Sequence, residues 1–307
     1  MFPIAPSEQN VDVTADGRFA PSPTGPLHLG SLRTALAAWL FARSQSARFL
    51  VRIEDLDAQR ARSEYEQEQL ADLRALGIDW DGPVARQSER TPLYDDALAE
   101  LQHQGRLYPC FCTRAEIREA ASAPHGESPE GAYPGTCARL TKHEQSRLIA
   151  EGRRYALRVR AEAERIEFDD RLLGRVGTIV DDFVVRRADG VPAYQLAVIV
   201  DDADQGIGEV VRGADLAEST PRQILLARLL GLPVPSYAHV PLVLAPDGSR
   251  LAKRDQGATL IEREEPPAAT LTLLASTLGF NRPVTTASEL LADFDPARIP
   301  LEPVVLL

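Results

Sequence analysis

The sequence predicts an α/β fold built on a doubly wound parallel sheet, and three features of its N-terminal part support this. A short strand near Arg18 leads through a proline-rich turn into a helix over 30–44, whose leucines recur at helical spacing. A near-continuous apolar run over 48–53 is typical of a strand buried on both faces. A charged helix follows over 60–76 and ends at Gly77. Alternating strands and helices favour a parallel sheet, which places ligands at the polar ends of its strands.

The composition restricts the size, compartment and partners of the protein. The chain has 307 residues, of which 44% are hydrophobic, enough for a sizeable core and about two domains. It has no apolar run near the ~20 residues that cross a bilayer and no basic, apolar leader, so we expect a cytoplasmic protein. Three cysteines argue against a disulfide framework. The net charge of −11 disfavours non-specific binding to nucleic acid, so an RNA partner needs a local basic surface.

The pattern changes in the middle of the chain. A helix is predicted over 93–105, and the stretch 106–190 then holds all three cysteines, a loop rich in Gly, Pro and Ser, and short strands such as 154–160. We interpret this stretch as an insertion between the two halves of the sheet. An apolar strand is predicted over 196–200, ending in two aspartates, and 209–212 continues the strand pattern.

The C-terminal third is expected to complete the sheet. A helix over 220–230 opens with Ser219, Thr220 and Pro221 as cap and first-turn residues, and a strand covers 239–244. The last sixty residues are mostly helical in pattern. The predicted division is an N-terminal arm (1–15), the first half of the nucleotide-binding fold (16–105), the inserted subdomain (106–190), the second half of the fold (191–245), and a mobile loop with a helical C-terminal segment (246–307).

The stretch 18–31 predicts a phosphate site. A strand that delivers a helix N-terminus past a glycine-bearing turn brings free backbone N–H groups and the positive end of the helix dipole together. The stretch matches neither the P-loop nor the dinucleotide-binding pattern. It offers instead His28, one turn before the helix, where a phosphate would lie. The alternative is a proline-rich connection whose histidine only packs.

The same stretch carries a family resemblance. Its pattern Pro-Ser-Pro-Thr-Gly-x-Leu-His-x-Gly resembles the first class-defining motif of class I aminoacyl-tRNA synthetases, in the form found in glutamyl enzymes. Further blocks match in order and spacing through most of residues 18–260. These blocks are Arg52-x-Glu54-Asp55-x-Asp57, Tyr108-Pro109-Cys110-Phe111-Cys112-Thr113, Tyr194-Gln195-Leu196-Ala197-x-x-Val200-Asp201-Asp202, Val211-Arg212-Gly213-Ala214-Asp215-Leu216 and Arg250-Leu251-Ala252-Lys253-Arg254. The resemblance implies a Rossmann-type fold with a zinc-bearing insertion.

The resemblance also implies a reaction, in which a carboxylate attacks the α-phosphate of ATP to give an aminoacyl adenylate and pyrophosphate. An ionised carboxylate needs no general base, so catalysis rests on positioning and on stabilising charge on the phosphate oxygens. ATP, accompanied by Mg²⁺, is expected to meet His28, Gly30 and Ser31 on one side and Lys253 on the other. The loop of Lys253 departs from the family's Lys-Met-Ser-Lys-Ser pattern at Arg250, Ala252 and Arg254, and the loss of a hydroxyl at Ala252 leaves its hydrogen bond in question. A solvated loop charge is the alternative for Lys253.

Glutamate binding is implied by a second set of matching positions. Arg18 and Arg212 are the candidates for the carboxylates, because a guanidinium pairs with a carboxylate at two points. Glu54 is the candidate for the ammonium group, and the hydroxyls of Ser22 and Tyr194 complete the set. The predicted pocket comprises Arg18, Phe19, Ala20, Pro21, Ser22, Glu54, Tyr194 and Arg212. An internal salt bridge between Arg212 and Glu54 is the alternative, and it could coexist with the pocket.

Cys110 and Cys112 form a Cys-x-Cys pair that can bind zinc, and Cys137 supplies a third thiolate. By residue type, His125 or His143 could complete four ligands. The segment Tyr-Pro-Gly-Thr-Cys over 133–137, however, resembles a variant of the family's zinc site in which tyrosine is the remaining ligand. We therefore predict one structural zinc held by Cys110, Cys112, Tyr133 and Cys137, with His125 as the substitute. Two small buried thiols on a strand are the alternative.

The C-terminal part points to one branch of the family. Only residues 255–307 follow the Lys253 loop, too few for the anticodon-binding region of glutamyl-tRNA synthetases. With the cysteine pattern, this resembles the truncated glutamyl-queuosine tRNA(Asp) synthetases. That family activates L-glutamate with ATP without tRNA and transfers it to queuosine, the modified wobble base of the tRNA(Asp) anticodon. The expected partners are ATP, glutamate and this anticodon stem-loop, and we expect a monomer. A minimal enzyme that charges a tRNA 3′ end and a non-catalytic RNA- or amino-acid-binding paralogue are the alternatives.

Overall fold

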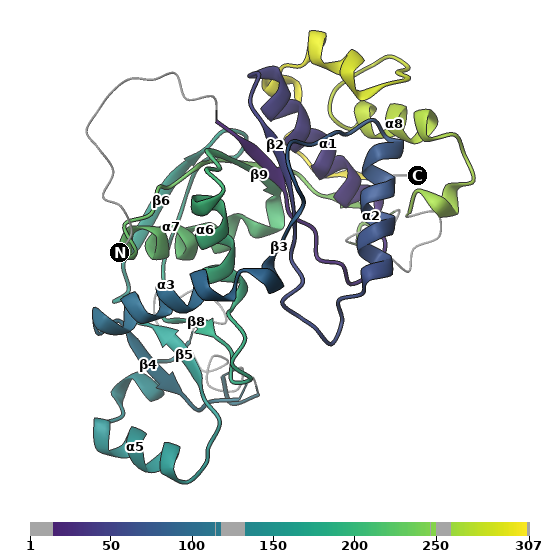
Figure 1. Cartoon of the computed structure of the whole chain (residues 1–307). Helices are drawn as coiled ribbons and strands as arrows, with labels where there is room; N and C mark the ends of the chain where they lie inside the picture. Colours follow the sequence, from purple (N-terminus) through teal and green to yellow (C-terminus); the bar gives the residue numbers. More distant parts are fainter. Residues whose placement is uncertain (1–14, 114, 118–132, 246, 250–258, 306–307) are drawn as a thin grey trace.

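The computed structural model describes residues 15–113, 115–117, 133–245, 247–249 and 259–305. Figure 1 shows a larger α/β body that carries α1, α2, β9 and α8, and a smaller body below it that carries β4, β5 and α5. Within the described residues, no helix is long and apolar enough to span a membrane.

The first half of the main sheet consists of three parallel strands in the order β1 (Gly17–Phe19), β2 (Phe49–Ile53) and β3 (Ala85–Arg86). The helices α1 (Leu29–Ser44) and α2 (Ser63–Ala75) connect them. Leucines of α1 at positions 32, 36 and 40 are fully buried at helical spacing, so this helix forms the centre of the larger core. The predicted strand–helix order is confirmed.

The second half of the sheet contains the parallel strands β9 (Glu209–Gly213) and β10 (Ser236–Val240), connected by α7 (Thr220–Leu229). The backbone N–H groups of Gly208 and Glu209 donate to the carbonyl of Asp16, so β9 continues the sheet beside β1. The first and second halves therefore extend in opposite directions from the β1–β9 pair. A crevice outside the carboxyl ends of strands at such a reversal is where doubly wound sheets bind ligands.

The middle of the chain contributes to both bodies. After α3 (Thr91–His103), the strands β4 (Leu107–Cys110), β5 (Ala156–Val159) and β8 (Phe183–Arg186) form a small antiparallel sheet, with α5 (Lys142–Ala150) nearby (Figure 1). The antiparallel pair β6 (Arg165–Asp170) and β7 (Gly174–Ile179) instead joins the main sheet, where β6 lies parallel to β10.

The C-terminal part packs against α1. It contains α8 (Pro267–Ser276), the 3-10 helices η4 (Ile261–Arg263), η5 (Ala287–Asp293) and η6 (Pro296–Arg298), and β12 (Val304–Val305), which pairs with β11 (Val243–Leu244). Val304 and Val305 thus form a strand within a stretch that was predicted to be mostly helical. The strand predicted over 239–244 is interrupted at Pro241 and Leu242, where the chain passes from β10 to β11.

One local prediction was wrong. The apolar run 196–200 is not a strand but the interior of helix α6 (Tyr194–Asp204), whose residues 196–202 are all buried. A short run that is apolar on every side fits a buried helix as well as a buried strand, so periodicity did not separate them.

Ser219 is the N-cap of α7, as predicted, and Thr220 and Pro221 open the helix, but the Ser219 side chain makes no cap hydrogen bond. Ser219 also ends the 3-10 helix η3 (Ala214–Ser219), and its hydroxyl donates to the Leu216 carbonyl.

Candidate functional site

His28 forms the N-cap of α1 and folds back over the first turn of the helix. Its backbone is extended, its Nδ1 accepts a hydrogen bond from the Ser31 N–H at 3.2 Å, and its Nε2 lies 3.2 Å from the Ser31 hydroxyl. A Cβ on Gly30 would lie only 3.0 Å from the imidazole ring. Glycine at this position therefore allows the histidine to sit against the helix N-terminus, whose dipole favours an anion.

A cavity of about 280 Å³ opens in front of this helix end, at the β1–β9 junction. It is of the size that suits a small-molecule ligand. Of the residues predicted to bind glutamate or ATP, those that line it are Arg18, Phe19, Ala20, Pro21, Ser22, His28, Gly30, Ser31, Glu54, Tyr194 and Arg212. The cavity thus brings together residues from four separate parts of the chain.

Lys253, the remaining predicted residue, lies outside the described residues, as do Arg250, Ala252 and Arg254. Residues on both sides of that segment are described. Val243, on β11, lines the cavity, and Thr259 forms an antiparallel bridge with His28.

Arg18, on β1, lines the cavity, and its guanidinium group forms an ion pair with the buried carboxylate of Asp202. Its Nε and Nη2 donate to Oδ1 and Oδ2 of Asp202, each at 3.2 Å. Arg52 Nη1 donates to Asp202 Oδ1 at 2.8 Å. Burial alone would raise the pKa of Asp202, but the charges of Arg18 and Arg52 outweigh it and hold that pKa below its usual value. The carboxylate is therefore ionised and orients Arg18. The prediction named Asp202 only as part of a matching block.

Glu54 follows β2 and has an unusual environment for a carboxyl. Its pKa is raised to about 7, because burial outweighs the opposing charges of Arg52 and Arg18. Its Oε1 lies 3.5 Å from Arg52 Nη2. Among the described residues, Glu54 pairs with Arg52 and not with Arg212, whose hydrogen bonds go to other side chains.

Arg212 lies on β9, and all three of its guanidinium nitrogens have a neighbouring side-chain partner. Its Nε donates to His239 Nε2 at 3.1 Å, and its Nη2 donates to Thr220 Oγ1 and Gln223 Oε1, both at 2.7 Å. Its Nη1 lies 3.4 Å from the Tyr194 hydroxyl, at the cavity wall. The sequence interpretation missed these supporting residues, because nothing in a linear pattern connects β10 and α7 to β9.

A second cavity, of about 750 Å³, adjoins the first and shares Ser22, Glu54 and Tyr194 with it. It extends from the main sheet to the small sheet. Its other lining residues include three arginines and two cysteines, namely Arg154, Arg158, Arg187, Cys110 and Cys112. Three acidic residues, Glu54, Asp57 and Asp189, also line it, and Arg187 is paired with Asp189 at 2.6 Å, so the cavity carries charges of both signs.

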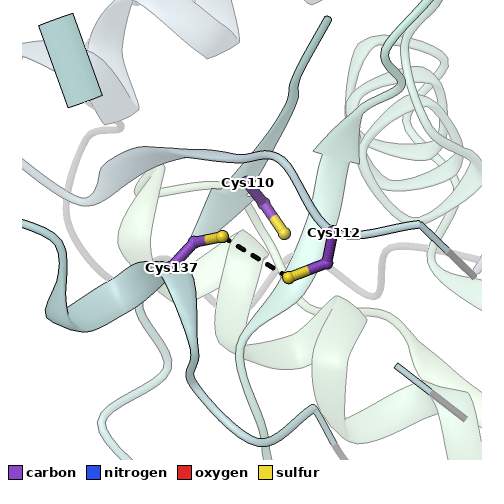
Figure 2. Close-up of side chains that lie close together, drawn as sticks. All are labelled: Cys110, Cys112 and Cys137. Atoms are coloured by element: carbon purple, nitrogen blue, oxygen red, sulfur yellow. Dashed lines mark hydrogen bonds between the residues drawn. The ribbon is translucent and has the colours of Figure 1, made fainter. Parts of the chain in front are cut away.

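The three cysteines converge at the edge of the small sheet, as Figure 2 shows. Their sulfur atoms all lie within 4.8 Å of one another, with Cys112 and Cys137 at 3.4 Å. Tetrahedral zinc, with Zn–S bonds near 2.3 Å and Zn–O bonds near 2.0 Å, requires about 3.8 Å between sulfurs and about 3.5 Å from sulfur to oxygen. The cluster is thus compact enough to hold a metal ion.

Tyr133 places its hydroxyl beside the same cluster. The hydroxyl oxygen lies 3.5 Å from Cys110 Sγ and 3.8 Å from Cys112 Sγ, and it accepts a hydrogen bond from the Cys137 N–H at 2.8 Å. Arg158 stacks over the Tyr133 ring at 3.8 Å and donates to Cys110 Sγ at 3.2 Å. The arrangement fits a site of three sulfurs and one oxygen whose negative charge is partly balanced by Arg158. Of the other two residues considered, His125 lies outside the described residues and His143 is exposed on α5.

Comparisons with known proteins place the chain in a family. Residues 14–294 match the family model for the catalytic domain of class I tRNA synthetases of the E and Q type. A glutamyl-Q tRNA(Asp) synthetase of Nocardia farcinica is 58% identical, covering 94% of this chain and 92% of its own. The enzyme of the same name from Symbiobacterium thermophilum is 51% identical, covering 94% of both chains. The crystal structure of a glutamate-tRNA synthetase from Elizabethkingia anophelis superposes with a TM-score of 0.82 at 30% identity, covering 96% of this chain and 68% of that one.

Proposed function

The chain belongs to the class I tRNA synthetases of the E and Q type, and from this premise we propose that it is an ATP-dependent ligase that attaches L-glutamate to queuosine in tRNA(Asp). One observation carries the proposal. The residues expected to hold an acidic amino acid and those expected to hold ATP line one cavity, and relatives named glutamyl-Q tRNA(Asp) synthetase match this chain over almost their whole length.

In the first step, a carboxylate oxygen of glutamate attacks the α-phosphorus of ATP, the bond to the bridging oxygen breaks, and pyrophosphate leaves with the electron pair. Arg18 and Arg212 bind the carboxylates, and ionised Glu54 binds the ammonium group. His28 and the first amides of α1 stabilise charge on the phosphates, and Mg²⁺ accompanies ATP. We assign Lys253 to the opposite side of the phosphates; the bridge between Thr259 and His28 brings the described end of its segment next to His28.

In the second step, a hydroxyl of the cyclopentene diol of queuosine attacks the glutamyl carbonyl, and AMP leaves. We assign the anticodon loop to the second cavity, because it shares Ser22, Glu54 and Tyr194 with the glutamate cavity. Arg154, whose described hydrogen bonds go to the Ala188 carbonyl and not to a carboxylate, is the candidate in this cavity for binding an RNA phosphate. One chain lines both cavities, so a monomer suffices for the reaction, which we place in the cytoplasm with its ATP and tRNA substrates.

We further propose that the cysteine cluster holds one structural zinc ion, with Cys110, Cys112, Tyr133 and Cys137 as its ligands. Bound zinc would tie β4 to the segment that precedes α5. Burial raises the pKa of the Tyr133 hydroxyl, so the ion must lower it for the phenolate to bind. The Cys137 N–H and Arg158 both favour the phenolate form.

The position of the attached glutamate tests the proposed function. Labelled glutamate and ATP are supplied with tRNA(Asp) that carries or lacks queuosine, and each tRNA is prepared with and without its 3′-terminal adenosine. Removal of the adenosine is preferable to periodate, because periodate also cleaves the diol of queuosine. Label that requires queuosine and survives loss of the adenosine is the expected result. Label that requires the adenosine would show a 3′-end-charging enzyme, and no label with any tRNA would overturn ligase activity.

A further inference from the structure

The buried side chain of His239 lies between a carboxylate and Arg212. His239 is on β10, directly opposite Arg212 on β9, and it is fully inaccessible to solvent. Its Nδ1 lies 2.5 Å from Oδ2 of Asp170, at the end of β6, and its Nε2 lies 3.1 Å from Arg212 Nε. Asp170, His239 and Arg212 thus form a chain of hydrogen bonds that runs from the protein interior to the cavity.

The donors in this chain determine the protonation of the imidazole. Arginine has N–H donors and no acceptor, so the His239 nitrogen that faces Arg212 Nε must present a lone pair. The single ring proton then lies on Nδ1 and is donated to Asp170. Nε2 also lies 3.2 Å from the Thr220 hydroxyl, whose proton can go to Nε2 or to the Leu216 carbonyl. A second proton on Nε2 would oppose the N–H of Arg212, so the contact with Arg212 favours a neutral ring protonated at Nδ1.

We propose that His239, with its tautomer set by Asp170, is a positioning residue that aims Arg212 at a carboxylate of glutamate. The inference rests on the proposed function and deepens it. Arg212 Nε donates to His239, and Nη2 donates to Thr220 and Gln223. Nη1 remains at the cavity, beside the Tyr194 hydroxyl. A guanidinium fixed in this way loses little rotational freedom when it binds its substrate.

The surroundings of His239 support a neutral ring. The ring stacks on Tyr237 with an interplanar angle of 10°. Burial lowers the pKa of His239, and although Asp170 opposes this, the positive charges of Arg212 and Arg18 act in the same direction as burial. Burial alone would raise the pKa of Asp170, but hydrogen bonds from His239 and from backbone amides hold it below its usual value.

Two substitutions of His239 separate its two hydrogen bonds. In His239→Asn the amide is near the position of Nδ1, so it reaches Asp170 and leaves Arg212 Nε without an acceptor. In His239→Gln the side-chain oxygen reaches the position of Nε2 and still accepts from Arg212. We expect the Asn variant to raise the KM for glutamate about 10-fold to 100-fold, the scale of one hydrogen bond to a charged group, with the KM for ATP unchanged. The Gln variant should stay within about threefold of the wild type.

Asp170→Asn tests whether the tautomer of His239 matters, because it changes the partner of the ring without substituting His239 itself. Asp170 Oδ1 accepts from the backbone N–H groups of Leu172 and Leu173, and it shares the His239 backbone N–H with Oδ2, so the oxygen of an asparagine is best satisfied at the Oδ1 position. Its NH₂ group then occupies the place of Oδ2 and donates to His239 Nδ1, which moves the ring proton to Nε2, against Arg212. The KM for glutamate should rise as in His239→Asn, although Arg212 and His239 are both intact.

The measurement is glutamate-dependent exchange of pyrophosphate into ATP, with the melting temperature recorded for every variant. His103→Asn, an exposed histidine at the end of α3, is the matched control and should behave as the wild type. A rise in the KM for glutamate that is equal in the Asn and Gln variants of His239, or is matched by the KM for ATP, would overturn the positioning role. If His239→Asn does not fold, the remaining two variants test the positioning role. The KM for glutamate should then rise in Asp170→Asn and stay near the wild-type value in His239→Gln. Lack of exchange in the wild type would overturn the proposed function instead.

Discussion

Arg18 and Asp202 are 184 residues apart in the sequence and form a buried ion pair with two contacts of 3.2 Å. The pair joins β1, from the first half of the sheet, to α6, from the second half. The arginine that lines the first cavity is therefore oriented by a residue on a distant element. This relationship leads to the first prediction.

Asp202→Asn should weaken both the fold and glutamate binding. The substitution leaves the guanidinium groups of Arg18 and Arg52 buried without their shared counter-charge, and breaking such a buried pair costs about 3–5 kcal/mol. Denaturant unfolding and the KM for glutamate measure the two effects. Asp169→Asn, whose partner Arg175 is exposed, is the control and should change neither quantity. An unchanged KM in a folded Asp202→Asn variant would contradict the orienting role.

Glutamate binding should weaken as the pH falls through the pKa of Glu54. Burial raises this pKa to about 7, so Glu54 is ionised above that pH and increasingly neutral below it. Only the ionised form attracts the ammonium group of glutamate, so the KM for glutamate should rise about tenfold for each pH unit below 7. The KM is measured by pyrophosphate exchange from pH 5.5 to 8.5. Glu54→Gln should have a high KM that does not depend on pH. A wild-type KM that is flat over this range would exclude the assignment.

Two substitutions of His28 should separate its cap from its role toward ATP. Asparagine is a good N-cap and keeps an acceptor for the Ser31 N–H, whereas alanine loses the cap at a cost of about 1 kcal/mol. Both variants lose the imidazole, so both should lose about 10²-fold or more in the rate of adenylate formation. Thermal unfolding and single-turnover adenylate formation are the measurements. A normal rate in His28→Asn would leave His28 as a cap only.

The purified protein should contain about one zinc ion per chain. Cys137→Ser should lose most of the metal, and a chelator should destabilise the wild type by removing it. Tyr133→Phe tests the oxygen ligand, because it keeps the ring under Arg158 and removes only the hydroxyl. It should lower zinc affinity about 10-fold to 100-fold, measured by competition with a chromogenic chelator. Equal zinc affinity in Tyr133→Phe would exclude tyrosine as a ligand and favour His125.

Lys253→Ala should slow adenylate formation and leave glutamate binding nearly intact. The lysine is expected to contact ATP phosphates and not the amino acid, so its loss removes stabilisation of the transition state. We expect pyrophosphate exchange to fall about 10²-fold, with glutamate affinity, measured by calorimetry, within about twofold. Arg254→Ala, the adjacent basic residue, is a control for the general charge of the loop. An exchange rate equal to that of the wild type would count against the role of Lys253.

Much of the fold was predictable because local physical chemistry determines it. The helix over 29–44 follows from apolar spacing. Its start depends on His28, which accepts from the Ser31 N–H, and on Gly30, which leaves room for the imidazole ring. The prediction of a strand at 196–200 was wrong because contacts with distant elements, and not local patterns, determine the structure there. That run is buried on all sides, so its sequence carries no periodicity, and its packing between α3, α7 and β8 decides that it is helical.

The identity of the candidate site residues could be read from linear motifs. Arginines, a glutamate and a histidine at motif spacing indicated glutamate and ATP, and three cysteines with Tyr133 indicated a metal site. The way these groups are held follows from three-dimensional packing. Asp202 orients Arg18, burial raises the pKa of Glu54, and Asp170 acts on Arg212 through His239. Orientation and burial depend on residues that are distant along the chain and adjacent in space, and a linear pattern does not encode that adjacency.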